Sequence, residues 1–340
     1  ENCTFLDIDS QAVNFQYPVS YDYRNDVFYN TTKNYDATIE NCRFIAPSHT
    51  TQRRAIIHAI QVRGVDGLAV SNNYFEWCDV CLSGETTFDR IEDVEADTYT
   101  PTVSGWSLGP VKRSGRGTQF TGNKIVNASE NAVYASTMDA VIANNVFENN
   151  ALDYCAGGIK VRAKNCSVTG NTLTVGAGAP TGISVQEPAF NVAVSANSIS
   201  ISDAVAAVGN GGAIDISPVG LSSYIDNRSD YLTAYRPMEN VSATGNVIRF
   251  TDAASAGTTQ VGIRIYSDSS DANFPDGQIR GVTISGNTIS KHKIGILFVN
   301  NMTRAVTVSG NSFVGKSFSE SGFDASTTMN TYATVCADLS

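Results

Sequence analysis

The chain has 340 residues, of which 42% are hydrophobic and only 16% are charged, and its formal net charge is −10 at pH 7. Low charge with ample Val and Ile is typical of chains that bury much of their backbone in sheet, and frequent Gly, Asn, Ser and Thr indicate many turns. The acidic balance disfavours nucleic acid as a partner, and no apolar stretch has the length of a transmembrane helix, so we expect no membrane insertion.

One short sequence pattern recurs from the beginning of the chain to its end. It consists of alternating apolar residues, then Ser or Thr, a small residue and Asn, and then any residue followed by Ile, Leu or Phe. Its copies span Val70–Phe75, Phe120–Ile125, Ile142–Phe147, Val168–Leu173, Val194–Ile199, Ala243–Ile248, Ile284–Ile289 and Val308–Phe313. A variant, Glu-Asn-Cys-x-Phe, begins at Glu1 and again at Glu40. The recurring Asn fits a turn position at which stacked side-chain amides bond to one another along an axis.

A second pattern, a small residue followed by two apolar residues around a variable one, lies between these copies. Its copies are Ala59–Val62, Val80–Leu82, Ala132–Ala135, Gly158–Val161, Gly182–Val185, Ala213–Ile216, Gly262–Ile265 and Gly295–Phe298. Each repeat therefore contains two short strands with period-2 alternation, and the small residue fits a tight corner. One repeat cannot bury its own apolar face, whereas stacked repeats bury a continuous core and pair their strands in parallel. The sequence predicts an all-β right-handed parallel β-helix, a single-stranded solenoid of about ten coils with long loop insertions.

The domain organisation follows from where the repeat is interrupted. We expect the β-helix body to cover residues 1–315, and a C-terminal segment, residues 316–340, to leave the repeat, from where it could lead to a further domain. Three insertions, residues 83–117, 217–240 and 266–280, leave from the same corner, just after the second strand of their coils. Because the first residues are already in repeat register, we expect a piece of a longer polypeptide or capping by neighbouring subunits.

The second strands and the insertions together predict a trough for a substrate. One outward column reads Gln61, Cys81, Tyr134, Lys160, Ser184, Asp215, Arg264 and Leu297, and the next reads Arg63, Ser83, Ser136, Arg162, Gln186, Ser217, Tyr266 and Val299. The floor would consist of Tyr134, Lys160, Arg162, Gln186, Glu187 and Asp215, and the walls would carry Tyr99, Trp106, Tyr224, Tyr231 and Tyr235. The substrate-binding candidates are Tyr134, Lys160, Arg162, Gln186, Arg264, Tyr266, Trp106, Tyr224 and Tyr231. In the alternative interpretation, the aromatic side chains only pack the loops onto the body.

Two carboxyl groups about 5–10 Å apart, one of them protonated, are required for glycoside hydrolysis. The catalytic candidates are Glu187 and Asp215 in consecutive coils, with Asp153 as a third. Loop carboxylates such as Asp226, Asp230 and Glu239 could replace either member of the Glu187 and Asp215 pair. For Asp215 the alternative is a structural ion pair with Arg264 on the next coil.

A polysaccharide lyase would use different residues. It removes the proton α to a uronate carboxylate with a base such as Tyr or Lys, and a cation neutralises the acid, roles that fit Tyr134, Lys160 and Arg162. The acidic run at residues 89–97 is typical of a solvated loop, and the three histidines are scattered along the chain. We therefore expect neither a metal site nor a cofactor.

The seven cysteines have no disulfide spacing. The single C-x-x-C, from Cys78 to Cys81, lacks both the second pair of a zinc site and a thioredoxin-like context, so free buried cysteines are expected.

The coil with stacked Ser/Thr-Gly-Asn-x-Ile turns resembles the pectate-lyase-like superfamily of right-handed parallel β-helices over nearly the whole chain. Within it, the acidic, Asn-, Ser- and Thr-rich body is similar to the central body of a bacteriophage tailspike. This resemblance implies a homotrimer in the tail of the virion, made in the host cytoplasm, that binds and depolymerises a bacterial cell-surface polysaccharide such as capsule or O-antigen. The superfamily also holds lyases, epimerases and esterases, so a secreted bacterial enzyme and a non-catalytic glycan-binding adhesin stay open as alternatives.

Overall fold

The computed structural model describes residues 1–15, 19–22, 27–30, 34–47, 57–62, 65–84, 98–99, 102–103, 106–107, 111–112, 116–135, 137–150, 158–175, 181–186, 189–201, 211–217, 238–251, 261–266, 279–292, 294–299 and 303–314. In these ranges the regular structure consists of strands. No helix in this part of the chain is long and apolar enough to cross a membrane.

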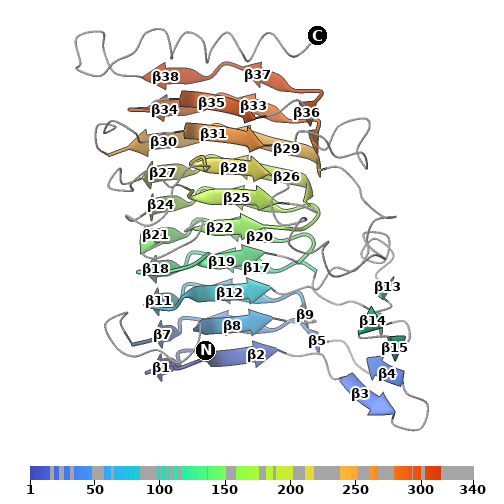
Figure 1. The fold of residues 1–340 in the computed structure, drawn as a ribbon. Helices are drawn as coiled ribbons and strands as arrows, with labels where there is room; N and C mark the ends of the chain where they lie inside the picture. Colours follow the sequence, from blue (N-terminus) through green and yellow to red (C-terminus); the bar gives the residue numbers. More distant parts are fainter. Residues whose placement is uncertain are drawn as a thin grey trace.

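Three long sheets form the body, and the chain passes through sheet 1, sheet 2 and sheet 3 in turn on every coil. Figure 1 shows the coils stacked from β1 and β2 at one end to β37 and β38 at the other. Every pairing within the three sheets is parallel, and sheet 1 has ten strands. The fold is therefore a right-handed parallel β-helix of ten coils, as the sequence predicted.

The strand bounds are as follows. Sheet 1 contains β1 (Thr4–Leu6), β7 (Arg43–Ile45), β11 (Tyr74–Glu76), β18 (Lys124–Val126), β21 (Val146–Asn150), β24 (Thr172–Val175), β27 (Ser198–Ile201), β30 (Val247–Phe250), β34 (Thr288–Ser290) and β38 (Ser312–Val314). Sheet 2 contains β2 (Gln11–Phe15), β8 (His58–Val62), β12 (Val80–Gly84), β19 (Val133–Ala135), β22 (Ile159–Val161), β25 (Ile183–Gln186), β28 (Ile214–Ser217), β31 (Val261–Tyr266) and β35 (Ile294–Val299). Sheet 3 contains β6 (Thr38–Glu40), β10 (Ala69–Ser71), β17 (Gln119–Thr121), β20 (Val141–Ala143), β23 (Ser167–Thr169), β26 (Phe190–Ser195), β29 (Met238–Thr244), β32 (Ile279–Arg280), β33 (Thr283–Ser285), β36 (Thr303–Arg304) and β37 (Thr307–Ser309).

The prediction of two strands in each repeat was wrong, because the first pattern contains a sharp turn. The residue before the recurring Asn has a positive φ, for example 55° at Asn72 and 66° at Gly122. Such a left-handed residue redirects the chain, so the residues before the turn pair in sheet 3 and those after it pair in sheet 1. Each full coil therefore has three strands.

A ladder of asparagines, buried except for the partly exposed Asn311, runs along this turn, as the sequence predicted. Its members are Asn73, Asn123, Asn145, Asn171, Asn197, Asn246, Asn287 and Asn311. Each Nδ2 from Asn73 to Asn287 donates to the Oδ1 of the next member over 2.9–3.0 Å. In the variant pattern, Cys42 takes the equivalent place, and its N–H donates to Asn73 Oδ1 over 2.8 Å. Because a buried polar group must find a partner, the ladder holds successive coils in one register.

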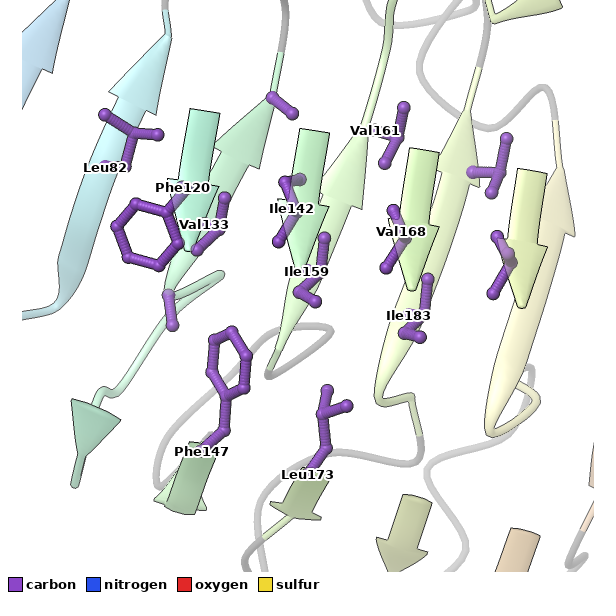
Figure 2. Packing of buried hydrophobic residues seen from close by; sticks show 14 of the residues in the cluster. Leu82, Phe120, Val133, Ile142, Phe147, Ile159, Val161, Val168, Leu173 and Ile183 are labelled. Carbon is purple, nitrogen blue, oxygen red and sulfur yellow. The ribbon is translucent and has the colours of Figure 1, made fainter. Parts of the chain in front are cut away.

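The core is a stack of equivalent apolar side chains inside the coils. Figure 2 shows Val133, Ile159 and Ile183 of sheet 2 in one row, with Phe147 and Leu173 of sheet 1 close by. At the N-terminal end, the rings of Phe5, Phe44 and Phe75 stack with centroids 4.8 Å apart. This separation is about that of neighbouring strands, so one residue type can repeat in one row without a void.

The small residues of the second pattern lie at a crowded corner, as expected. A Cβ added at Gly158 would meet the carbonyl oxygen of Gly182 at 2.1 Å and Leu173 Cδ2 at 2.7 Å. A Cβ at Gly295 would meet the ring of Phe313 at 2.4 Å. The corner before sheet 2 therefore packs its backbone directly against side chains of sheet 1.

All three predicted insertions leave sheet 2 and return to sheet 3. They follow β12, β28 and β31, and the third returns at β32. The insertion after β12 carries two antiparallel ladders, β13 (Thr98–Tyr99) with β16 (Val111–Lys112) and β14 (Thr102–Val103) with β15 (Trp106–Ser107). A further insertion, which the sequence did not indicate, follows β2 and forms the hairpin β3 (Val19–Asp22) and β4 (Val27–Asn30), and β4 contacts β16. The short strands β5 (Asn34–Tyr35) and β9 (Val65–Asp66) pair in parallel where the chain passes from sheet 2 to sheet 3.

All five cysteines that the structure describes are free thiols. Cys42, Cys78, Cys81 and Cys166 are buried, as predicted, and Cys3 is exposed.

Candidate functional site

The outer face of sheet 2 carries the predicted floor of the trough. Its central column reads Asn14, Gln61, Ser83, Tyr134, Lys160, Ser184, Asp215, Arg264 and Leu297. The predicted pairing of Ser184 with Asp215 is confirmed. The predicted place of Cys81 is wrong, because Leu82 pairs with Val133 and Cys81 therefore lies in the row of small corner residues. Ser83 takes its place in the column.

Tyr134, Lys160 and Arg162 form one cluster on this face. Arg162 follows directly after β22, and its Nη1 donates to the Tyr134 hydroxyl over 2.9 Å. Lys160 Nζ lies 5.2 Å from the centre of the Tyr134 ring. All three side chains are partly exposed. An aromatic ring held between two cations combines a stacking surface with charged hydrogen-bond donors.

Asp215 and Arg264 form a buried ion pair between β28 and β31. Arg264 Nε donates to Asp215 Oδ1 over 2.6 Å, and Nη2 donates to Oδ2 over 3.0 Å. Burial raises the pKa of Asp215, and the hydrogen bonds and charge of Arg264 oppose this rise. Tyr266 lies beside the pair, with its ring centre 5.3 Å from the Arg264 guanidinium carbon. Both carboxylate oxygens therefore bind Arg264, which is the structural ion pair that the sequence analysis gave as the alternative to catalysis. The catalytic role of Asp215 stays a prediction.

The exposure of the outer face differs from strand to strand. Ser184 and Ser217 have 1% and 0% of their surfaces exposed, although they point away from the core. Asp215 and Arg264 are also buried, whereas Tyr134, Lys160, Arg162 and Gln186 are partly exposed. The partly exposed positions therefore lie on both sides of the ion pair, on β19, β22 and the end of β25 on one side and at Tyr266 and Leu297 on the other.

Several predicted site residues lie outside the described residues. These are Glu187, Asp153, Tyr224, Tyr231, Tyr235, Asp226 and Asp230. Trp106 and Tyr99 are described only by their backbones, in β15 and β13. Glu239, expected on a loop, lies in β29 of sheet 3, and its Oε1 is 3.8 Å from Arg280 Nη1. Because sheet 3 is a different face, Glu239 is not part of the floor.

The structure adds a carboxylate pair that the sequence reasoning missed, Asp79 and Glu130. Each stands two residues before the small residue of its coil, and the N–H of Glu130 donates to the carbonyl of Asp79 over 3.2 Å. Burial raises the pKa of Glu130, the Asp79 charge raises it further, and His58 and Lys160 oppose the rise. The missed signal is two carboxylates at the same position of consecutive repeats.

Among the described residues, no three His, Cys, Asp or Glu side chains converge as a metal site would require.

Comparison with known proteins gives distant structural likeness. No family model matches the chain, and no curated protein matches it in sequence. The chain is similar to the surface protein and adhesin PfbA of Streptococcus pneumoniae, with 15% identity, a TM-score of 0.45, and coverage of 89% of this chain and 74% of that one. It is also similar to a mutant tailspike protein of E. coli bacteriophage HK620 in complex with a hexasaccharide, with 12% identity, a TM-score of 0.42 and coverage of 90% of this chain. The chain spans about half, 51%, of that tailspike chain. The fold assignment above rests on the strand pairing itself.

Proposed function

We propose that this protein binds a bacterial surface polysaccharide on the outer face of sheet 2 and cleaves it by glycoside hydrolysis. The observation that carries the proposal is the Tyr134–Lys160–Arg162 cluster, a partly exposed aromatic ring flanked by two cations on a rigid sheet. The proposal includes the biological setting that the resemblance implies, a homotrimeric tailspike in a phage virion.

The cluster has the chemistry that a sugar chain requires. The Tyr134 ring offers a flat apolar face, and the donors of Lys160 and Arg162 can bond to hydroxyl or carboxylate oxygens. Tyr134 and Lys160 stand on paired strands, so their backbone positions are fixed before a ligand binds. Gln186, one coil further along, extends the polar surface in the direction in which a linear glycan would lie.

A lyase is the second candidate, and the hydrogen bond between Arg162 and Tyr134 favours it. The Tyr134 hydroxyl could act as the base in β-elimination from a uronate, and Arg162 and Lys160 beside it could neutralise the uronate carboxylate. The two reactions give different products, since elimination leaves an unsaturated sugar and hydrolysis does not.

The test is digestion of a panel of capsular and O-antigen polysaccharides. New reducing ends without ultraviolet absorbance of an unsaturated sugar would support hydrolysis, and new absorbance would make the protein a lyase. Binding without any new ends would leave a glycan-binding adhesin and refute the proposed cleavage. Failure of every polysaccharide in the panel to bind would refute the binding proposal as well.

A matched pair of variants tests the position of the site. Arg162→Met removes a charged donor from the cluster, and we expect about 10–100-fold weaker binding, since a charged hydrogen bond contributes about 1.5–3 kcal/mol. Arg43→Met removes the similar arginine 5.2 Å from the Tyr74 ring on sheet 1 and should leave binding unchanged. Equal effects of the two substitutions would place the glycan elsewhere.

A further inference from the structure

Asp79 and Glu130 meet in the corner that leads into sheet 2, on consecutive coils. Asp79 is buried, and its Oδ2 accepts the N–H of Ile57 over 2.7 Å. Its Oδ1 accepts the hydroxyl of Ser129, the residue before Glu130. The Asp79 carboxylate is therefore held on both oxygens and fixes the turn that carries Glu130.

Glu130 is joined to Asp79 by the hydrogen bond from its own N–H to the Asp79 carbonyl, and it precedes Tyr134 of the cluster by four residues on the same coil. Its side chain is partly exposed, and three charged or titratable groups act on it electrostatically, namely Asp79, His58 and Lys160. Lys160 is also a member of the cluster, in the coil that follows Glu130. Glu130 is therefore joined to the cluster through the chain that leads to Tyr134 and through the charge of Lys160.

Unsatisfied polar atoms mark the same corner. Asn131 is 8% exposed, and its Oδ1 has no hydrogen-bond partner among the described residues. His58 Nδ1 is likewise buried without one in this part of the chain. His58 pairs with Val80, and the register places Val80 beside Asn131, so both atoms belong to one row. Buried polar atoms without partners are rare, so these two atoms require a partner that the described residues do not supply.

We propose that Glu130 is the proton donor of the cleavage reaction and that Asp79 is its positioning residue. The inference rests on the proposed hydrolysis at the outer face of sheet 2. The Glu130 proton passes to the glycosidic oxygen as the bond from that oxygen to the anomeric carbon breaks, and the electron pair leaves with the oxygen. Water adds to the anomeric carbon and releases a proton to solvent, and Glu130 takes up a proton before the next cycle.

The electrostatics of the corner agree with this role. Burial and the Asp79 charge raise the pKa of Glu130, so its acid form persists to higher pH than that of an ordinary glutamate. Asp215 is less suited, because both of its oxygens accept hydrogen bonds from Arg264.

The first test compares Glu130→Gln with Glu76→Gln on a polysaccharide from the panel that the wild type cleaves. Glu76 is a partly exposed glutamate on sheet 1 that accepts a hydrogen bond from Tyr74. We expect Glu130→Gln to lower kcat about 100-fold or more with unchanged polysaccharide binding, and Glu76→Gln to behave as the wild type. Wild-type kcat in Glu130→Gln would overturn this inference alone. Absence of cleavage by the wild-type protein would overturn the proposed function, and this inference with it.

The pH dependence of kcat separates a proton donor from a merely structural residue. Because Glu130 must be protonated to act, kcat falls as the pH rises through its pKa. Lys160 lowers that pKa and Asp79 raises it, so Lys160→Gln should move the fall to higher pH and Asp79→Asn should move it to lower pH. If Asp79→Asn does not fold, the shift expected for Lys160→Gln alone still tests the assignment. An unchanged fall in every folded variant would refute the assignment of Glu130.

Discussion

Replacement of Asp215 by Asn distinguishes the two roles that the sequence allows for this residue. In the folded protein, Asp215 and Arg264 have about 6% of their surfaces exposed and share two hydrogen bonds. Asp215→Asn leaves the Arg264 charge buried without its partner, which typically costs about 3–5 kcal/mol. At about 2.1 cal/mol/K per residue, a 340-residue chain has an unfolding entropy of about 0.7 kcal/mol/K. The melting temperature should therefore fall by about 4–7 °C.

The double variant Asp215→Leu, Arg264→Met completes the test. Burial raises the pKa of Asp215 despite the arginine, so the pair gains little over an apolar pair of similar volume. We expect the double variant to melt within about 3 °C of the wild type, a difference of about 1–2 kcal/mol. Glu239→Gln, which removes an exposed ion pair between β29 and β32, should change the melting temperature by about 1 °C or less. If Asp215→Asn keeps the wild-type melting temperature and loses cleavage, Asp215 is catalytic and the structural interpretation fails.

The remaining predictions concern the scaffold, and thermal or urea unfolding measures each. Asn171→Ala removes the hydrogen-bond partners of the Ile142 carbonyl and of two Asn145 donors, so it should lower the free energy of unfolding by about 3 kcal/mol or more. Asn165 belongs to a second row of asparagines, which is exposed, so Asn165→Gly should lower the free energy of unfolding by about 1 kcal/mol or less. Equal losses of unfolding free energy in the two variants would show that the buried ladder does not stabilise the fold more than the exposed row does. Gly158→Ala should destabilise by about 1–3 kcal/mol through its clash with the next coil, while Gly245→Asn, with φ at 63° and no atom within 4 Å of an added Cβ, should be nearly neutral. The reverse order would refute the steric reasoning.

The fold could be predicted because its strongest constraints repeat in the sequence. An Asn at one position of successive coils must bond to its copies once it is buried, so the pattern itself predicts parallel stacking. The prediction of two strands in each coil was wrong because of a local feature of the backbone. The residue before that Asn adopts a positive φ, and alternation of apolar residues does not reveal where a short strand bends.

The site was harder to predict than the fold, because its residues occupy variable positions of the repeat or lie next to it. Tyr134, Lys160 and Arg162 were found because they occupy outward positions of recognisable strands. Cys81 was misplaced because the corner before β12 was aligned two residues out of register. Glu130 was missed because it precedes its strand, where the apolar alternation that located the strands is absent, and only a correct alignment of the coils brings it beside Asp79.

The parallel register explains how such a site tolerates insertions. A long insertion separates Ser83 from Tyr134 in sequence, whereas a much shorter segment separates Tyr134 from Lys160, yet both pairs are neighbours in sheet 2. The distance between column neighbours is set by strand pairing and by the buried asparagines, not by the length of chain that leaves the corner. Loops can therefore change in length and sequence while Glu130, Lys160 and Tyr134 keep their spacing. Under the proposed function, this arrangement would separate the chemistry, fixed on the coils, from the specificity, which the insertions are free to alter.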